Sequence, residues 1–433
     1  MGHWKQIIAS LQSGEAGPAL ARLYGGAPKT LREQAGRYVR AVEAFHRLYP
    51  EQAEIELFSS PGRTEVGGNH TDHNGGRILA AAVDLDILAV AARNDDRVLR
   101  VTSAGYSTGV VGLEDLTPQE SERYTSAALA RGVCARFQAL GCQPGGFDAY
   151  VTSTIPKGSG LSSSAAYELL VAVIENDLYN GSRLDPLPLA RIAQFSENQF
   201  FGKPCGLMDQ SAVAVGGLVF IDFQDFERPL VRQVEVDFSR SGYTVMIVDT
   251  GGSHADLNDD YAALEREMKS VARAFGGQVL REFSAQKVLE NLAYLRTRVS
   301  DRAILRALHF YADDQRVVEM VAALERDDFA QFMRLVIASG ESSWMLCQNV
   351  YTHKDIEHQG ISIALAATQN LLKGRGAWRV HGGGFAGTIL AFVPDEQVEE
   401  YTAGMEAIFG AGACHALRIR PAGACRLAFG EMG

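Results

Sequence analysis

The sequence predicts an α+β protein with more than one domain. Segments typical of strands and of helices follow one another without the regular strand–helix alternation of a parallel α/β sheet. The chain has 433 residues, enough for two or three domains at about 150 residues each. Hydrophobic residues make up 46% of it and charged residues 21%. That balance is typical of a globular protein and excludes a disordered chain or a fibre.

The N-terminal half begins with a predicted helical lead-in over residues 1–48. Its apolar residues recur at helical spacing, and a Gly/Pro break at 25–28 divides it into two helices. The elements predicted next are a strand at 55–58, a polar loop at 59–77, an apolar stretch at 78–93, a strand at 97–102, a helix at 122–141, a strand at 147–155, helices at about 162–179 and 189–202, and a strand at 217–223. The polar stretch 224–242 predicts a boundary, so the domains are expected at 49–235 and 236–433.

The C-terminal half opens with a predicted strand at 245–248. Amphipathic helices are predicted at 257–275, 313–325 and 327–338, followed by a glycine loop that leads into a strand at 381–393. A helix at 398–409 and two short strands complete the chain.

Charge and cysteine content restrict the partners and the compartment. There are 41 Lys and Arg against 52 Asp and Glu, a formal net charge of −11, which argues against nucleic acid or an anionic membrane as the main partner. The sequence contains no apolar run of about 18 residues, no signal-peptide pattern at its start and no CxxC pair among its six cysteines. We therefore expect a cytoplasmic protein with reduced thiols. The oligomeric state stays open, with a monomer as the default.

The strongest chemical signal is PKGSGLSSSAA at 156–166. Gly158 and Gly160 allow the backbone to approach a ligand closely, and three serines then open a predicted helix. The first turn of a helix presents unpaired N–H groups and the positive end of the helix dipole, which suits the phosphates of a di- or triphosphate. Neither the Walker pattern nor the dinucleotide fingerprint matches. A serine cap after a glycine turn would explain the same residues without a ligand.

The polar segment SSPGRTEVGGNHTDHNGGR at 59–77 lies between two apolar runs. Asn69, His70 and Asp72 together supply donors and acceptors for several vicinal hydroxyls. The planar guanidinium of Arg63 suits a phosphate. Two alternatives stay open: an Asx-rich turn without a ligand, and a metal centre of His70, Asp72 and His73, which would need further ligands downstream.

Two carboxylates, Glu197 and Asp209, follow the glycine-rich segment. Glu197 lies on a predicted helix, and Asp209 lies in GKPCGLMDQSA, where glycines and a proline predict a tight turn. A lone Asp in such a turn usually caps a helix. Phosphoryl transfer, however, needs one carboxylate to hold Mg²⁺ and a second to meet the attacking hydroxyl. Glu197 and Asp209 fit those two roles, with one of the serines as a further metal ligand.

These blocks together resemble the GHMP small-molecule kinases, and most closely the galactokinase family among them. PGRTEVGGNHTDHNGG is similar to the galactokinase signature, PKGSGLSSSAA to the phosphate loop, HGGGFAGTILAFV to the third glycine motif, and GKPCGLMDQ to the turn that carries the catalytic Asp. The resemblance spans roughly residues 50 to 430. It implies a two-domain fold with the active site in the cleft between the domains, and Mg²⁺-dependent transfer of phosphate from ATP to the C1 hydroxyl of galactose.

The resemblance also implies a role for each matching residue. Asp209 would act on the sugar hydroxyl, and Arg63 would stabilise the transferring phosphoryl group. If the two face each other, Arg63 should keep Asp209 ionised, with a pKa at or below about 3.9. The other implied contacts are Asn69, His70, Thr71, Asp72, Gly206 and Tyr261 to the sugar; Gly158, Ser159, Gly160, Leu161, Ser162, Ser163 and Ser164 to ATP; and Ser164 and Glu197 to Mg²⁺.

Two departures from the family pattern leave the sugar open. Galactokinases usually read GEHTDYN where this chain reads GNHTDHN, so Asn69 replaces a sugar-binding Glu and His73 replaces a Tyr. Asn keeps an acceptor oxygen but loses the charge, so its hydrogen bond to a hydroxyl is weaker. The alternatives are a kinase for another sugar, such as N-acetylgalactosamine or arabinose, and a non-catalytic sensor of galactose and ATP.

Overall fold

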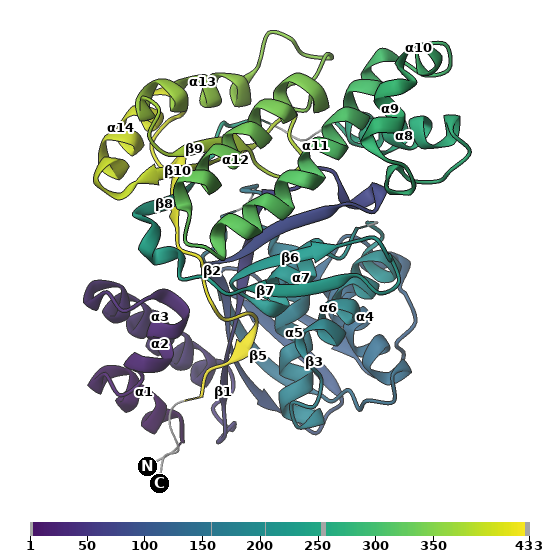
Figure 1. The fold of residues 1–433 in the computed structure, drawn as a ribbon. Helices are drawn as coiled ribbons and strands as arrows, with labels where there is room; N and C mark the ends of the chain where they lie inside the picture. The colour runs from purple at the N-terminus through teal and green to yellow at the C-terminus, as the bar shows by residue number, and fades with distance from the viewer. Residues whose placement is uncertain (1–2, 157, 204, 253–256, 429–433) are drawn as a thin grey trace.

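The computed structural model describes residues 3–156, 158–203, 205–252 and 257–428, and two β-sheets organise them (Figure 1). The larger sheet has the order β12 (Cys425–Arg426), β1 (Glu56–Gly67), β2 (Arg77–Arg93), β5 (Phe147–Ser153), β3 (Val98–Ser103) and β4 (Thr108–Gly112), with β6 (Leu218–Asp222) paired to β2 and β7 (Leu230–Val234) paired to β6. The smaller sheet has the order β11 (Cys414–Leu417), β8 (Tyr243–Asp249), β10 (Thr388–Pro394) and β9 (Ala377–Val380). The predicted α+β class is confirmed.

Helices cover both faces of the larger sheet. On one face lie α1 (His3–Ser13), α2 (Gly17–Tyr24) and α3 (Pro28–Leu48), which pack on alternate residues of β2 such as Leu88 and Val90. The lead-in therefore has three helices rather than the predicted two, because Gly14, at a φ of +89°, ends the first one. The intervening residues Ala89 and Ala91 face the opposite side of the sheet.

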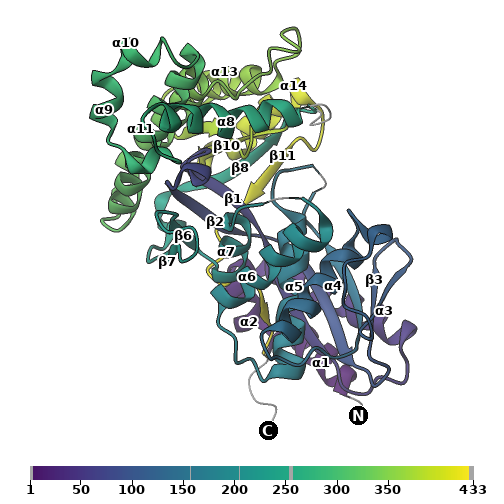
Figure 2. The same cartoon turned by 90° about the vertical axis from the view of Figure 1, so that its right-hand side faces the viewer.

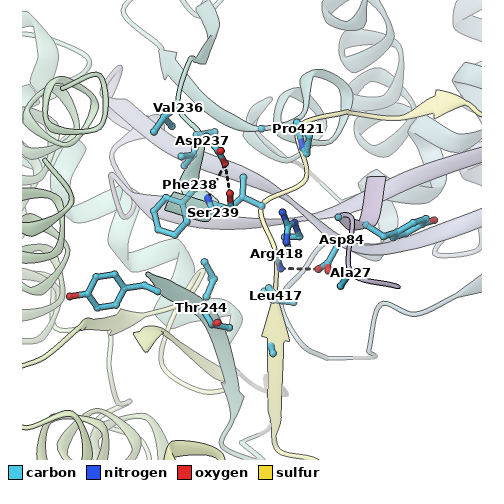
Figure 3. Close-up of a pocket in the computed structure, with 18 of the residues that line it drawn as sticks. Ala27, Asp84, Val236, Asp237, Phe238, Ser239, Thr244, Leu417, Arg418 and Pro421 are labelled. Atoms are coloured by element: carbon cyan, nitrogen blue, oxygen red, sulfur yellow. Dashed lines mark hydrogen bonds between the residues drawn. The ribbon is translucent and has the colours of Figure 1, made fainter. Parts of the chain in front are cut away.

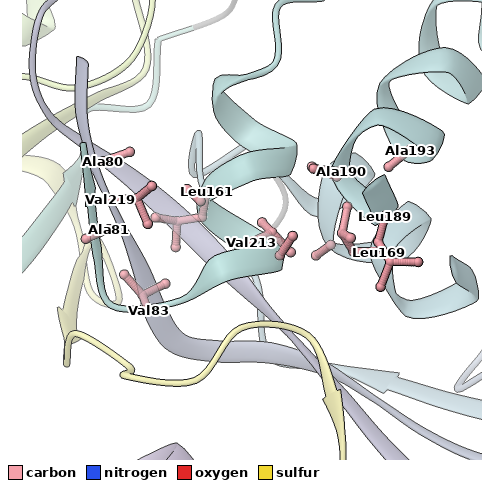
Figure 4. Packing of buried hydrophobic residues seen from close by; sticks show 14 of the residues in the cluster. Ala80, Ala81, Val83, Leu161, Leu169, Leu189, Ala190, Ala193, Val213 and Val219 are labelled. Carbon is pink, nitrogen blue, oxygen red and sulfur yellow. The ribbon is translucent and has the colours of Figure 1, made fainter. Parts of the chain in front are cut away.

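On that opposite face lie α4 (Ser126–Ala139), α5 (Ser163–Asn180), α6 (Pro186–Ser196) and α7 (Met208–Val215). Figure 4 shows Leu161 beside Val219 of β6, with Ala80 of β2 pointing to the same side of the sheet. Small side chains on the strand let the helices approach the sheet closely. This packing fixes the position of α5 relative to β1.

The second half, from β8 to β11, stacks above the larger sheet. Strands β1 and β2 run from one half to the other (Figures 1 and 2). The helices of the second half are α8 (Asn258–Ala274), α9 (Ala285–Glu290), α10 (Leu292–Leu295), α11 (Asp301–Leu324), α12 (Phe329–Ser342), α13 (Gly360–Leu372) and α14 (Val398–Phe409). The helix predicted at 313–325 is the last part of the longer α11, which packs on β2. Within the described ranges, no helix is both long and apolar enough to cross a bilayer.

Two segments predicted to be irregular are strands. Residues 59–67, predicted as part of a loop, continue β1 as far as Gly67, and shifts of register between Pro61 and Arg63 and between Glu65 and Gly67 accommodate their polar side chains. The stretch 224–242 contains β7, which forms a hairpin with β6. Neither strand has the alternation of apolar and polar residues that predicts one, because residues 59–67 of β1 are buried on both faces and β7 is short and mostly exposed.

The end of the described chain returns to the first half. After β11 it runs back along the larger sheet, and β12 pairs with β1 as its outer neighbour (yellow in Figure 1). Arg420 on this return segment is fully buried and donates to Ser59 and Asp86. Asp86 also accepts hydrogen bonds from Arg37 of α3 and Tyr24 of α2. Burial alone would raise the pKa of Asp86, but the two arginines outweigh it and lower the pKa. This cluster ties the lead-in, the sheet and the return segment together.

A cavity of 710 Å³ lies where the lead-in, the larger sheet and the smaller sheet meet (Figure 3). Its lining carries Asp84, Asp237 and Arg418, and the backbone N–H of Arg418 donates to Asp84 over 2.9 Å. Burial raises the pKa of Asp84 to about 6. This contact holds the return segment against β2.

Candidate active site

The glycine-rich segment forms a loop between β5 and α5, as predicted. Gly158 and Gly160 have φ angles of +78° and +72°, and α5 begins at Ser163. A Cβ on Gly160 would lie 3.1 Å from Nδ1 of His381 in the second half, so the loop needs a glycine there. The loop lines a pocket of 250 Å³ together with Arg63, Lys203 and Asp209.

The residues of this loop differ in what they offer a ligand. Ser163 is exposed at the first turn of α5, whereas Ser159 is buried and donates to the carbonyl of Pro156. The side chain of Leu161 points into the core, and its carbonyl accepts from the backbone N–H of Arg63 (Figure 4). Only the backbone of Leu161 can therefore face a phosphate. Lys157 of the same motif lies outside the described residues.

Arg63 and Asp209, far apart in the sequence, form a bidentate ion pair beside this loop. Nε and Nη2 of Arg63 each lie 2.6 Å from one carboxylate oxygen, and Ser162 donates to Oδ2 over 2.7 Å. The third arginine nitrogen, Nη1, donates to the carbonyl of Gly160. Burial alone would raise the pKa of Asp209, but the charge and hydrogen bonds of Arg63 outweigh it and lower that pKa. The expected pairing and its effect on ionisation are both found.

A second group of carboxylates lies at the start of α5. Ser164 Oγ donates to Glu197 Oε1 over 3.2 Å, and Glu197 begins a π-helical turn that continues α6. Gln210 donates to Glu197 over 2.8 Å and to Glu168 over 3.3 Å. Glu168 Oε1 has no hydrogen-bond partner among the described residues. Burial and the charge of Glu197 both raise the pKa of Glu168.

These groups fit Mg²⁺, because hydroxyl and carboxylate oxygens are its preferred protein ligands. A cation beside these carboxylates would favour the ionised form of Glu168, whose pKa is raised by burial and by the charge of Glu197. Sequence reasoning missed Glu168. Its position four residues after Ser164, on the same face of a helix, was the available signal.

The segment after β1 turns sharply at His70, which has a φ of +58°. Thr71 is fully buried and donates to the carbonyls of Gly68 and Arg77, so it holds the turn rather than facing a ligand. Asp72, in the short 3₁₀ helix Asp72–Asn74, is partly exposed and approaches Gly206 so closely that a Cβ there would lie 3.2 Å from its Oδ2. The structure thus brings Asp72 and Gly206 together.

The third glycine motif forms a loop between β9 and β10, and its carbonyls accept hydrogen bonds from the predicted sugar-site residues. Asn69 donates to Gly382, His70 donates from Nε2 to Gly383, and Tyr261 donates to Gly384, each over 2.9 Å. Burial lowers the pKa of His70. Since His70 is directed at Gly383, it does not converge with Asp72 and His73, and no metal-binding group of three such side chains occurs in the described part of the chain.

His381, at the start of this loop, packs against the phosphate loop at Gly160, and sequence reasoning did not single it out. It is buried, its Nδ1 lies 2.9 Å from Thr388 Oγ1, and its Nε2 has no partner within the described ranges. Burial and the nearby charges of Arg63 and Arg379 lower its pKa to about 3. A neutral imidazole therefore packs against Gly160, and the site lies where the two halves meet.

Comparisons with known proteins find relatives over most of the chain. A model described as GHMP kinases N terminal domain matches residues 128–217, and one described as galactokinase galactose-binding signature matches residues 43–93. The galactokinase of Streptomyces coelicolor is 31% identical over 382 residues, which cover 87% of this chain and 94% of that protein. The galactokinase of Streptococcus suis is 32% identical over 369 residues, which cover 83% and 90%.

Solved structures share the fold. The structure of Lactococcus lactis galactokinase complexed with galactose matches with a TM-score of 0.74 at 23% identity, over 88% of this chain and 97% of that one. A mevalonate kinase structure matches with a TM-score of 0.58 at 16% identity, over 84% and 98%.

Proposed function

The chain belongs to the galactokinase family, and from this premise we propose that it transfers the γ-phosphate of ATP to the C1 hydroxyl of galactose. The observation that carries the proposal is the Arg63–Asp209 pair beside the phosphate loop. A guanidinium and an ionised carboxylate there meet the two needs of the reaction: charge for the phosphoryl group and an acceptor for the hydroxyl proton.

Asp209 has one obvious place for the sugar hydroxyl. Its Oδ2 accepts from Arg63 and Ser162, whereas its Oδ1 accepts only from Arg63 among the described residues. A carboxylate oxygen has two lone pairs, so Oδ1 keeps one for the hydroxyl. Because its low pKa makes Asp209 a weak base, it orients the hydroxyl first and takes the proton only as the new O–P bond forms.

Arg63 acts on the phosphoryl group. Its Nη1 holds the carbonyl of Gly160, which fixes the guanidinium at the edge of the phosphate loop. As the bond to the leaving oxygen of ADP breaks, charge on the transferring group is offset by this fixed cation. The unpaired N–H groups of the first turn of α5 bind the remaining phosphate oxygens.

Ser164 and Glu197 would hold Mg²⁺, which neutralises the ATP phosphates when bound. Asp72 lies beside Gly206 and is partly exposed, and it is proposed to accept from sugar hydroxyls. We further propose that the enzyme acts in the cytoplasm, since all six cysteines are unpaired.

The test is ADP release with Mg²⁺ and ATP across a panel of hexoses, hexosamines and pentoses. We expect turnover with galactose and not with glucose, and a sugar 1-phosphate as the product by phosphorus NMR. Turnover with another sugar and none with galactose would overturn the substrate and keep the kinase. Calorimetric binding of both galactose and ATP without any ADP release would favour the sensor, although the intact Arg63–Asp209 pair argues against it.

A further inference from the structure

Asn69 occupies the position where galactokinases usually carry a Glu, and its side chain is completely buried. Its Nδ2 donates to Glu65 Oε1 and to the carbonyl of Gly382, both over 2.9 Å. Its Oδ1 accepts from Asn349 Nδ2 over 2.8 Å and from Ser343 Oγ over 3.3 Å. An amide side chain has two N–H donors and two lone pairs, so all four are in use.

The orientation of this amide is determined by its partners. Gly382 offers a carbonyl oxygen, which can only accept. Glu65 Oε1 also accepts from Arg379 Nη2 over 2.8 Å, so the Glu65 oxygen is an acceptor as well. Turning the Asn69 amide by 180° would place its oxygen against both acceptors and its nitrogen against the donor Nδ2 of Asn349.

The carboxylate of this region is therefore that of Glu65, which Asn69 contacts through its Nδ2. Glu65 is 5% exposed and pairs with Arg379, which is 0% exposed, on the side of the second half. The amide of Asn69 lies between two parts of the protein, bonded to Glu65 of β1 on one side and to Ser343, Asn349 and Gly382 of the second half on the other.

We infer that Asn69 is a positioning residue that does not contact the sugar. The substrates are then galactose-like aldoses, and residue 69 forms no hydrogen bond with the hydroxyl that a Glu at this position would bind. This inference rests on the proposed function. Its physical basis is that a site lacking a partner for one hydroxyl discriminates weakly at that hydroxyl. A site built to bond a hydroxyl rejects the analogue without it by about 10⁴-fold or more.

The test is a double-mutant cycle between the residue and the sugar. The kcat/KM values of the wild type and of Asn69→Ala are measured with galactose and with its 2-, 3-, 4- and 6-deoxy forms. If Asn69 touches no hydroxyl, the variant loses the same factor with all five sugars, and each coupling stays below about threefold. We expect the sugar KM to rise while the KM for ATP stays constant, because the Gly382 segment shifts but the phosphate loop does not.

Asp72→Asn is the positive control, since a carboxylate that accepts from a hydroxyl should give a coupling of tenfold or more with one deoxy sugar. A coupling of tenfold or more between Asn69 and any one hydroxyl would overturn the inference. If Asn69→Ala does not fold, Asn69→Ser, which keeps a hydroxyl for Glu65 or Gly382, is measured in the same cycle.

Failure of the proposed function is distinguishable from failure of the inference. It shows as an absence of ADP release by the wild type with galactose, before any variant is compared. The cycle is then measured as calorimetric sugar binding, where a coupling with residue 69 has the same meaning.

Discussion

Replacing Asp209 by Asn removes one negative charge while keeping the size of the side chain. In the wild type the carboxylate takes both Arg63 contacts at 2.6 Å and one from Ser162 at 2.7 Å. The amide nitrogen of Asn would face one of these donors, so one arginine N–H is left without an acceptor. A lost charge-assisted hydrogen bond lowers the free energy of unfolding by about 1.5 to 3 kcal/mol.

The effect on turnover should be larger than the effect on folding. A residue that accepts the hydroxyl proton contributes about 10² to 10⁴ in rate, which corresponds to about 3 to 5 kcal/mol in the activation barrier. A domain whose free energy of unfolding is typically about 5 to 15 kcal/mol stays folded after losing about 1.5 to 3 kcal/mol of it. Turnover of the variant should therefore nearly vanish in a sample that is still folded and still binds galactose.

The chain offers a matched control in Glu122, which forms a bidentate pair with Arg131 at 2.7 and 2.6 Å. The arginine and carboxylate side chains are 9% and 19% exposed in that pair, and 10% and 27% exposed in the Arg63–Asp209 pair. Glu122→Gln should lower the melting temperature by a similar amount and leave ADP release unchanged. Turnover of Asp209→Asn within tenfold of wild type, in protein that binds galactose normally by calorimetry, would refute the role of Asp209.

Three other predictions follow from the geometry. Glu197→Gln should raise the Mg²⁺ concentration for half-maximal ADP release by roughly tenfold or more, the worth of one charge-assisted contact; an unchanged Mg²⁺ dependence would remove Glu197 from the metal site. Asp86→Asn should lower the free energy of unfolding in urea by about 3 to 5 kcal/mol, because the buried Arg420 and the mostly buried Arg37 lose their counter-charge; a loss below 1 kcal/mol would contradict this. His381 has a pKa of about 3 when folded and about 6.5 when unfolded, so between these values the unfolded chain holds one more proton. The stability that the neutral imidazole contributes is complete above pH 6.5 and falls on acidification by about 1.4 kcal/mol per pH unit. His381→Asn should therefore flatten the decline in unfolding free energy between pH 7 and 5. An unchanged slope would show that the imidazole is not neutral.

Local signals predicted the phosphate loop and α5. Glycines that permit positive φ, followed by serines and an apolar helix, determine their own conformation within a dozen residues. The chemistry of phosphoryl transfer, which requires two carboxylates, likewise pointed to Glu197 and Asp209, and their roles stay predictions.

The parts that the sequence did not predict depend on distant contacts. The polar residues of β1 look like a loop, and only pairing with β2 makes them a strand. Which way the amide of Asn69 points is determined by Ser343, Asn349 and Gly382, all more than 270 positions away. No local pattern contains that information.

The return of the chain to β12 has a consequence for synthesis on the ribosome. Among the described residues, the outer neighbour of β1 is β12 (Cys425–Arg426), so this edge of β1 is open throughout translation of the second half. Open edges of this kind invite pairing between nascent chains. Arg420 is also translated late, so until then the buried carboxylate of Asp86 lacks one of its two arginine partners. The N-terminal half expressed alone should therefore aggregate, and the enzyme is a poor candidate for separation into independent fragments.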